Sequence, residues 1–329
     1  SENEHFGPAG VLAAELTQMN NETCNVYNML KLTRNLFEVT GDVKYAHFYE
    51  KGYLNAIMGS QNPETGMSMY FQPMKTGFFK VFSTPEHSFW CCTGTGMENF
   101  TKLNDSIYFH DQDAIYVNLY LASTLEWPEK QIKLIQTTNL PVSDTVKFTI
   151  KRLQEAAKSP VGLKLRVPDW VKGEASVKIN GKSATVLPVQ GYLEIVRQWA
   201  DNDTVELTLP LEVGVSRLPD DPDMVAFTFG PLVLCAPLGT KNMEQLPTGI
   251  NGTVKIPDGD TNINDTLLIK GKPADWLKNL KANLVRTSAA KLEFKLTNAR
   301  PELVFVPYYS HYKERYGIHW KLTTEKGQL

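Results

Sequence analysis

The chain has 329 residues, and its hydrophobic fraction of 42% and charged fraction of 21% are ordinary for a globular protein of two or three domains. Its 34 basic and 36 acidic residues give a net charge of −2 at pH 7. This balance provides neither the basic surface that nucleic acids require nor an acidic tail for a charge-driven partner. No apolar run approaches the ~20 residues that span a membrane.

The start of the chain lacks an initiator methionine, a basic segment and the apolar core of a signal peptide. We therefore expect the chain to be a fragment of a longer protein. Its first residues indicate no compartment.

Helices are predicted in the first third of the chain. Apolar residues at roughly helical spacing favour a helix within residues 22–38 that begins just after Cys24, and a second helix over 43–58; Gly41 is a stop signal for the first. An irregular aromatic segment leads to Trp90, and a further helix is expected over about 96–109. This part of the chain is therefore predicted to be helical, with long loops.

Short strands are predicted after Asp113, where the sequence becomes rich in β-forming residues. The expected strands cover residues 115–121, 146–150, 163–167, 175–179, 192–196, 205–209, 224–229, 232–234, 266–269, 291–296 and 303–306. Asn180-Gly181 is a tight-turn signal between two of them. Short strands separated by Gly, Pro and Asn residues indicate a β-sandwich. A polar stretch over 239–265 is interpreted as a linker or long loop.

The fold class expected from this pattern is α+β with several domains. We predict a helical domain over residues 1–112, a β-sandwich over 113–240, and a second β-rich domain, or a continuation of the sandwich, over 241–329.

Three of the four cysteines point to a metal site. A disulfide between neighbours in sequence is strained, so the adjacent Cys91 and Cys92 suggest thiolates that are held by a metal or used in chemistry. Together with Cys24 and Glu22 they would make a tetrahedral zinc site of three sulfurs and one carboxylate oxygen. Because residues two apart face opposite sides of a helix, we expect all four ligands on irregular backbone.

Other residues of interest have simpler readings. Cys235, within Leu-Val-Leu-Cys-Ala, fits a buried small hydrophobe. Glu4 and Glu98 could serve acid–base chemistry, but surface glutamates are common. His87, four residues before Cys91, could be a ligand or a polar contact.

Several segments resemble the zinc-dependent, cysteine-nucleophile glycoside hydrolases typified by β-L-arabinofuranosidases. The matching segments are Glu4-His5-Phe6, Glu22-Thr23-Cys24, the run from Ser83 to Asn99, Asp105-Ser106-Ile107-Tyr108, the run from Leu165 to Trp170, residues 177–182, Gly191-Tyr192, Arg197-Gln198-Trp199 and Gly230-Pro231-Leu232-Val233.

The resemblance implies a role for individual residues. The zinc ligands that it implies are Glu22, Cys24, Cys91 and Cys92. Cys91 corresponds to the nucleophile, Glu4 to the general acid/base and Tyr70 to a tyrosine that contacts the sugar near the nucleophile. His5, beside Glu4, is a candidate substrate-binding residue.

The resemblance also implies a partial catalytic domain. Residues 1–112 would supply the last helices of an (α/α)6 barrel, and the missing N-terminal half of that barrel would carry further sugar-contacting side chains. The isolated fragment is then expected to show little activity. The implied substrate is an arabinose-containing oligosaccharide or glycan, and degradation of plant glycans favours a periplasmic or secreted enzyme by analogy.

Three functions follow from these residues. The leading hypothesis is a retaining glycoside hydrolase with a zinc-bound cysteine thiolate as nucleophile and a glutamate acid/base. An alternative is a carbohydrate-binding or scaffold protein with a purely structural zinc. A third is a lyase or epimerase on a similar helical toroid.

Overall fold

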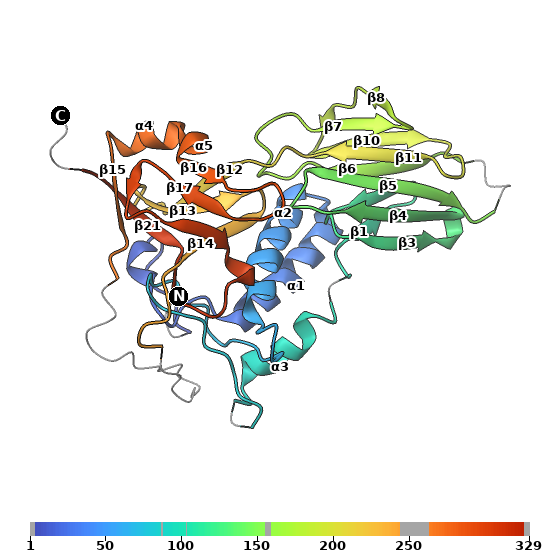
Figure 1. Ribbon diagram of the computed structural model, residues 1–329. Helices are drawn as coiled ribbons and strands as arrows, with labels where there is room; N and C mark the ends of the chain where they lie inside the picture. Colours follow the sequence, from blue (N-terminus) through green and yellow to red (C-terminus); the bar gives the residue numbers. More distant parts are fainter. Residues whose placement is uncertain (1–3, 87, 103, 155–158, 244–262, 326–329) are drawn as a thin grey trace. The chain divides into compact units, whose positions relative to one another are not determined.

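The computed structural model describes residues 4–86, 88–102, 104–154, 159–243 and 263–325 (Figure 1). The chain divides into two compact units, each assembled from separated stretches of sequence. The first unit comprises Ser1–Lys31, Lys51–Thr101 and Val213–Leu329, and the second comprises Leu32–Glu50 and Lys102–Glu212. Among the described residues, no helix is long and apolar enough to cross a membrane. His87 and residues 244–262 of the predicted linker lie outside the described residues.

The two helices predicted nearest the start are confirmed. Helix α1 (Thr23–Thr40) is followed by Gly41, whose φ of 66° ends it as the sequence predicts. Helix α2 (Val43–Lys51) continues through a π-helical turn η2 (Gly52–Ile57) and a 3-10 turn η3 (Met58–Ser60). Short 3-10 turns η1 (Ala13–Glu15), η4 (Pro128–Lys130) and η5 (Tyr308–Ser310) occur elsewhere.

Helix α3 (Cys91–Asn99) starts and ends earlier than the sequence predicts. The predicted helix over 96–109 is therefore wrong in its bounds. Trp90 precedes α3 with extended backbone, and Gly94 and Gly96, which resemble helix breakers in the sequence, lie inside the helix. The aromatic residues after α3 form a strand instead, because pairing of Tyr108 with Val117 satisfies their backbone groups.

Two sheets of the second unit share one hydrophobic core. One has the strand order β1-β2-β6-β10-β9 and the other β3-β4-β5-β11-β7-β8. Val146, Phe148 and Ile150 alternate along β5 and are buried, as are Leu163 and Leu165 of β6, and all five belong to this core. The strands of these sheets are β1 (Tyr108–His110), β2 (Ala114–Val117), β3 (Ser123–Trp127), β4 (Ile132–Thr138), β5 (Thr145–Arg152), β6 (Val161–Arg166), β7 (Ser176–Ile179), β8 (Lys182–Ala184), β9 (Pro188–Val189), β10 (Tyr192–Arg197) and β11 (Thr204–Thr208).

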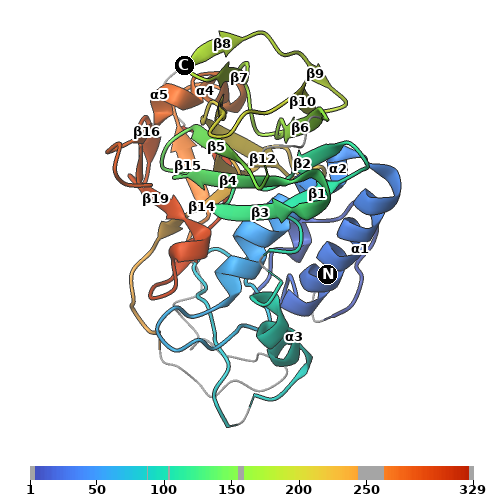
Figure 2. The same cartoon turned by 90° about the vertical axis from the view of Figure 1, so that its right-hand side faces the viewer.

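The predicted tight turn joins β7 and β8. Asn180 and Gly181 have φ values of 50° and 77°, the left-handed pair that a two-residue hairpin requires. The hairpin can be followed in Figure 2.

A buried ion pair stabilises the second unit. Glu50 Oε1 accepts from Arg166 Nη2 at 2.5 Å, and Glu50 Oε2 accepts from Trp170 Nε1 at 2.8 Å. Arg166 also donates through Nε to the Asn118 carbonyl oxygen at 2.6 Å. Glu50 is only 4% exposed and Arg166 is fully buried, so water solvates neither charge and each is compensated by the other.

We expect Glu50→Gln to lower the free energy of unfolding of this unit by about 3–5 kcal/mol, because it leaves the Arg166 charge buried and unpaired. Urea unfolding followed by circular dichroism would measure the change. The matched control is Glu206→Gln, which removes an exposed pair with Lys178 at 3.2 Å and should change stability by at most ~1 kcal/mol. Equal losses in the two variants would contradict this role of the buried pair.

The first unit contains a ten-stranded sheet of order β16-β17-β19-β14-β13-β21-β15-β18, with β12 paired to β13 and β20 to β14. Phe227, Phe305 and Trp320 fill its core and are almost completely buried. Its elements are β12 (Val213–Arg217), β13 (Met224–Phe229), β14 (Leu232–Pro237), β15 (Thr266–Ile269), α4 (Pro273–Lys278), α5 (Leu280–Asn283), β16 (Leu284–Arg286), β17 (Phe294–Leu296), β18 (Ala299–Arg300), β19 (Val304–Pro307), β20 (Tyr316–Gly317) and β21 (His319–Thr324). The prediction of an α+β fold is confirmed, while the domain boundaries at 112 and 240 stay a prediction.

The C-terminal strands hold the segment over residues 55–80 in place. Asn55 donates to the Pro231 carbonyl at 2.9 Å and accepts from the Val233 amide at 2.7 Å. Further along the segment, Arg315 Nη1 donates to the Gly77 carbonyl at 2.8 Å. Tyr316 and Lys80 add hydrogen bonds to Pro73 and Tyr308, respectively. Residues more than 150 positions apart in sequence thus form one hydrogen-bonded layer of the first unit.

Candidate metal centre and active site

The four predicted ligand residues come together within the first unit. One ligand atom from each of Glu22, Cys24, Cys91 and Cys92 lies within 4.8 Å of every other. Cys24 Sγ is 3.9 Å from Cys91 Sγ, and Glu22 Oε1 is 3.7 Å from Cys91 Sγ and 3.6 Å from Cys92 Sγ. The Cys24 thiol contacts the same carboxylate oxygen. No other group of this kind is found among the described residues.

Helix N-termini present the three sulfurs, which corrects the expectation of irregular backbone. Cys24 is the second residue of α1, and Cys91 and Cys92 are the first two residues of α3. Only Glu22 precedes its helix, where it forms an isolated β-bridge with Phe71. Side chains of a first helical turn have no preceding turn to pack on, so neighbouring residues can both reach a ligand beyond the helix end.

The unpaired amides of these helix ends favour negative charge on the sulfurs. The Cys24 amide donates to Cys92 Sγ at 3.3 Å. Burial acts in the opposite direction: it raises the pKa of the Cys24 thiol to about 12, and the Glu22 hydrogen bond adds to this effect. Burial also raises the pKa of Cys92. A cation among these groups would offset both effects, so the donor set fits a metal ion.

Tyr70 joins the cluster to Glu4. The Tyr70 hydroxyl lies 3.2 Å from Cys91 Sγ and donates to the Glu4 carboxylate. The Thr23 amide donates to the Tyr70 carbonyl at 2.9 Å, which fixes this residue beside the start of α1. Burial raises the pKa of Tyr70, so the phenol keeps its proton and can serve as a donor. His5 is exposed next to Glu4.

A pair that the sequence reasoning missed joins the two cysteine-bearing helices. The hydroxyl of Tyr27 on α1 donates to the carboxylate of Glu98 on α3. Tyr27 lies three residues after Cys24, and Glu98 follows the cysteine pair by about two helical turns, but the contact joins two helices and no local signal in the sequence predicts it. Cys235 lies outside the cluster and is buried in β14, as its apolar neighbours predict.

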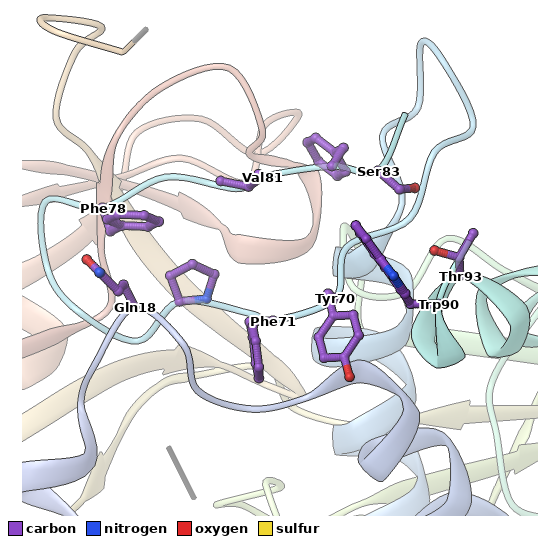
Figure 3. Close-up of a pocket in the computed structure, with 10 residues that line it drawn as sticks. Gln18, Tyr70, Phe71, Phe78, Val81, Ser83, Trp90 and Thr93 are labelled. Atoms are coloured by element: carbon purple, nitrogen blue, oxygen red, sulfur yellow. The ribbon is translucent and has the colours of Figure 1, made fainter. Parts of the chain in front are cut away.

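A small aromatic pocket lies behind Tyr70 and Trp90, with Phe78 at its other end (Figure 3). Its cavity volume is about 30 Å³, far below the ~300 Å³ of the smallest ordinary ligand pockets. A sugar ring therefore does not fit into it as it stands.

Comparison with known proteins identifies the relatives of this chain. Residues 1–105 match the catalytic domain of GH127 β-L-arabinofuranosidases, residues 114–211 match the middle domain of these enzymes, and residues 214–322 match a domain of unknown function. The non-reducing end β-L-arabinofuranosidase of Bifidobacterium longum subsp. longum is 24% identical over 236 residues, which are 66% of this chain and 35% of that protein.

Solved structures show the same fold. A GH127 β-L-arabinofuranosidase from Geobacillus stearothermophilus T6 superposes with a TM-score of 0.70 at 18% identity, over 94% of this chain and 51% of that one. A second GH127 β-arabinofuranosidase gives a TM-score of 0.69 at 20% identity, over 93% and 50%. The chain thus spans about half the length of these solved relatives.

The class that these matches define is that of the glycoside hydrolases. Two consecutive domains of one family cover residues 1–105 and 114–211. The chain belongs to the GH127 β-L-arabinofuranosidase family.

Proposed function

We propose that the enzyme containing this chain hydrolyses β-L-arabinofuranosides with retention of configuration, with Cys91 as nucleophile and Glu4 as general acid/base. The observation that carries the proposal is that the Tyr70 hydroxyl contacts both Cys91 and Glu4. This contact lies at the cluster of possible metal ligands, Glu22, Cys24, Cys91 and Cys92. The wider substrate would be an arabinose-containing oligosaccharide or glycan.

We propose zinc as the ion held by Glu22, Cys24, Cys91 and Cys92. Tetrahedral zinc with Zn–S bonds of about 2.3 Å separates its sulfurs by about 3.8 Å. The spacing of 3.9 Å between Cys24 and Cys91 agrees with this geometry. Three thiols and one carboxylate are a donor set that favours zinc over magnesium or calcium. When bound, zinc keeps its thiol ligands deprotonated at neutral pH.

Exposure distinguishes Cys91 from the other ligands. Cys91 is exposed, whereas Cys92 is buried and Cys24 is half-buried. A purely structural zinc site is normally closed on all sides. An exposed sulfur at the end of a helix is accessible to the anomeric carbon of a sugar. This favours a catalytic role of the metal centre over a purely structural one.

The separation of the two reacting groups suits a retaining reaction. An ordinary O–H···O contact of about 2.7 Å, combined with the 3.2 Å between Tyr70 and Cys91, keeps the Glu4 carboxylate within about 6 Å of Cys91 Sγ. Retaining glycosidases hold their two catalytic groups about 5–5.5 Å apart.

Two displacements then give retention. The Cys91 sulfur attacks the anomeric carbon, the glycosidic bond breaks, and the leaving oxygen takes the proton of Glu4. In the second step the Glu4 carboxylate accepts a proton from water, the water oxygen attacks the anomeric carbon, and the Cys91 sulfur leaves with its electron pair. The Tyr70 phenol, which keeps its proton, can donate to the sulfur as it leaves.

The proposal extends to the catalytic domain as a whole. Residues 1–112 would form the last helices of an (α/α)6 barrel, completed by an N-terminal half outside this chain. The fact that the chain spans about half of its solved relatives supports this arrangement. The β-rich parts over 113–240 and 241–329 would follow as separate domains.

Metal analysis tests the centre without a substrate. We expect the purified protein to hold about one zinc per chain, and Cys92→Ala to lose most of it, because a buried ligand is removed. Cys235→Ala is the matched control and should keep its zinc, since Cys235 lies in a separate apolar core. Inductively coupled plasma mass spectrometry after dialysis measures both. Equal zinc in the two variants, or none in the wild-type protein, would refute the centre.

A further inference from the structure

Helix α3 carries two of the proposed metal ligands, and little within this chain holds it in place. It has nine residues, two of which are glycines, so its own tendency to form a helix is low. Its buried residues are Cys92 and Asn99. The side-chain amide of Asn99 makes no hydrogen bond within the described residues, so its burial costs free energy. The position of α3 must therefore depend on a few specific contacts.

Two such contacts lie beyond the metal ligands. A Cβ atom added at Gly96 would lie 2.6 Å from Ser68 Oγ, so α3 packs closely on the segment that leads to Tyr70. The Glu98 carboxylate accepts a hydrogen bond from the hydroxyl of Tyr27 on α1. The Tyr27 side chain is only 4% exposed, so the neighbouring packing fixes its direction. The hydrogen bond therefore ties α3 to a rigid point of α1.

The hydrogen bond between Tyr27 and Glu98 joins the same two helices as the cysteines, at a second position along their axes. Glu98 lies seven residues after Cys91, on the same face of α3 and about 10 Å further along it. Tyr27 lies three residues after Cys24, about 4.5 Å further along α1. Two helices joined at one point can pivot about it. A second contact further along also fixes the angle at which they cross.

We propose that Tyr27 and Glu98 are positioning residues, which hold α3 at the angle to α1 that brings the α3 cysteines to the ion bound by Cys24. The proposal rests on the proposed function, because it assumes the zinc centre. Both residues act through Cys91. A small rotation of α3 would move its sulfur away from the anomeric carbon and leave the other sugar contacts in place. Loss of the hydrogen bond should therefore lower kcat more than it changes KM.

Cobalt substitution tests the geometry of the centre without a substrate, in the complete protein that carries this chain. Cobalt(II) can replace zinc in thiolate sites, and its absorption spectrum depends on the arrangement of the ligands. We expect Tyr27→Phe and Glu98→Ala to change this spectrum and to transfer zinc to a chelator about tenfold faster than the wild-type protein. Glu98→Gln keeps an oxygen that accepts from Tyr27, so its transfer rate should stay within about threefold of wild type.

A second hydrogen bond between a tyrosine and a glutamate in the same unit provides the matched control. The Tyr312 hydroxyl donates to Glu64 Oε1 at 3.1 Å, and neither residue belongs to the metal cluster. Tyr312→Phe should therefore leave the cobalt spectrum and the zinc transfer rate unchanged. A double variant that combines Tyr27→Phe with Glu98→Ala should lose zinc about as fast as either single variant, because each change removes the same hydrogen bond.

Kinetics separate positioning from a general loss of stability. Tyr27→Phe removes only a hydroxyl, and circular dichroism would verify that the variant is folded. We expect its kcat on an aryl β-L-arabinofuranoside to fall about tenfold while KM stays within about twofold. Wild-type spectra and rates in Tyr27→Phe and Glu98→Ala, or equal changes in Glu98→Gln and Glu98→Ala, would overturn the positioning role alone. A wild-type protein that binds neither zinc nor cobalt would refute the metal centre and the positioning role with it.

Discussion

Replacement of Cys91 by alanine is expected to lower kcat/KM on an aryl β-L-arabinofuranoside by about 10⁴-fold or more in the complete protein. The sulfur would form the bond to the anomeric carbon, and no other exposed thiol exists among the described cysteines to replace it. Initial rates over a range of substrate concentrations would give the change.

Metal content separates the chemical role of Cys91 from a structural one. Glu22, Cys24 and Cys92 remain in the Cys91→Ala variant and should retain at least part of the zinc. Cys235→Ala serves as the control for loss of a thiol elsewhere. A Cys91→Ala protein that keeps its zinc and stays within tenfold of wild-type activity would rule out the nucleophile role.

Replacement of Glu4 by glutamine should lower kcat/KM by about 10²–10⁴-fold for substrates with a sugar or alkyl leaving group, which need protonation. The loss should be far smaller for a dinitrophenyl glycoside, because its leaving group departs without a proton and kcat/KM reports this first step. Rates on both substrates therefore identify the acid.

The matched control is Glu64→Gln, since Glu64 is an exposed carboxylate of the same unit paired with Lys313. It should change neither rate. If Glu4→Gln lowered the rate on both glycosides to the same extent, Glu4 would have another role, such as holding Tyr70.

The sequence predicted the elements whose signals are local. Apolar spacing located α1 and α2, and runs of β-forming residues located β5 and β6. Strands β3 and β4 were missed, although Ile132–Thr138 alternates buried and half-buried residues, because its polar positions obscure the pattern. The order of the ten-stranded sheet could not be predicted, since β13 pairs with β21 almost 100 residues later and no local signal encodes such a pairing.

The candidate site was predictable in its residues and less so in its geometry. Adjacent cysteines near glycines pointed to a shared ion, and the four side chains do converge. Their place at two helix N-termini was not predicted, because the helix near Cys91 and Cys92 was expected to begin only at about residue 96. The Tyr27–Glu98 contact depends on how α1 and α3 cross, which only tertiary packing determines.

The hydrogen-bonded layer between residues 55–80 and the C-terminal strands has a consequence for biosynthesis. Asn55 and Gly77 find their partners at Pro231 and Arg315, which leave the ribosome much later. The segment that carries Tyr70 therefore gains these long-range hydrogen bonds only after Arg315 has been synthesised. A chain that stops before Pro231 would contain every proposed catalytic residue and still lack the hydrogen bonds that hold residues 55–80 in place.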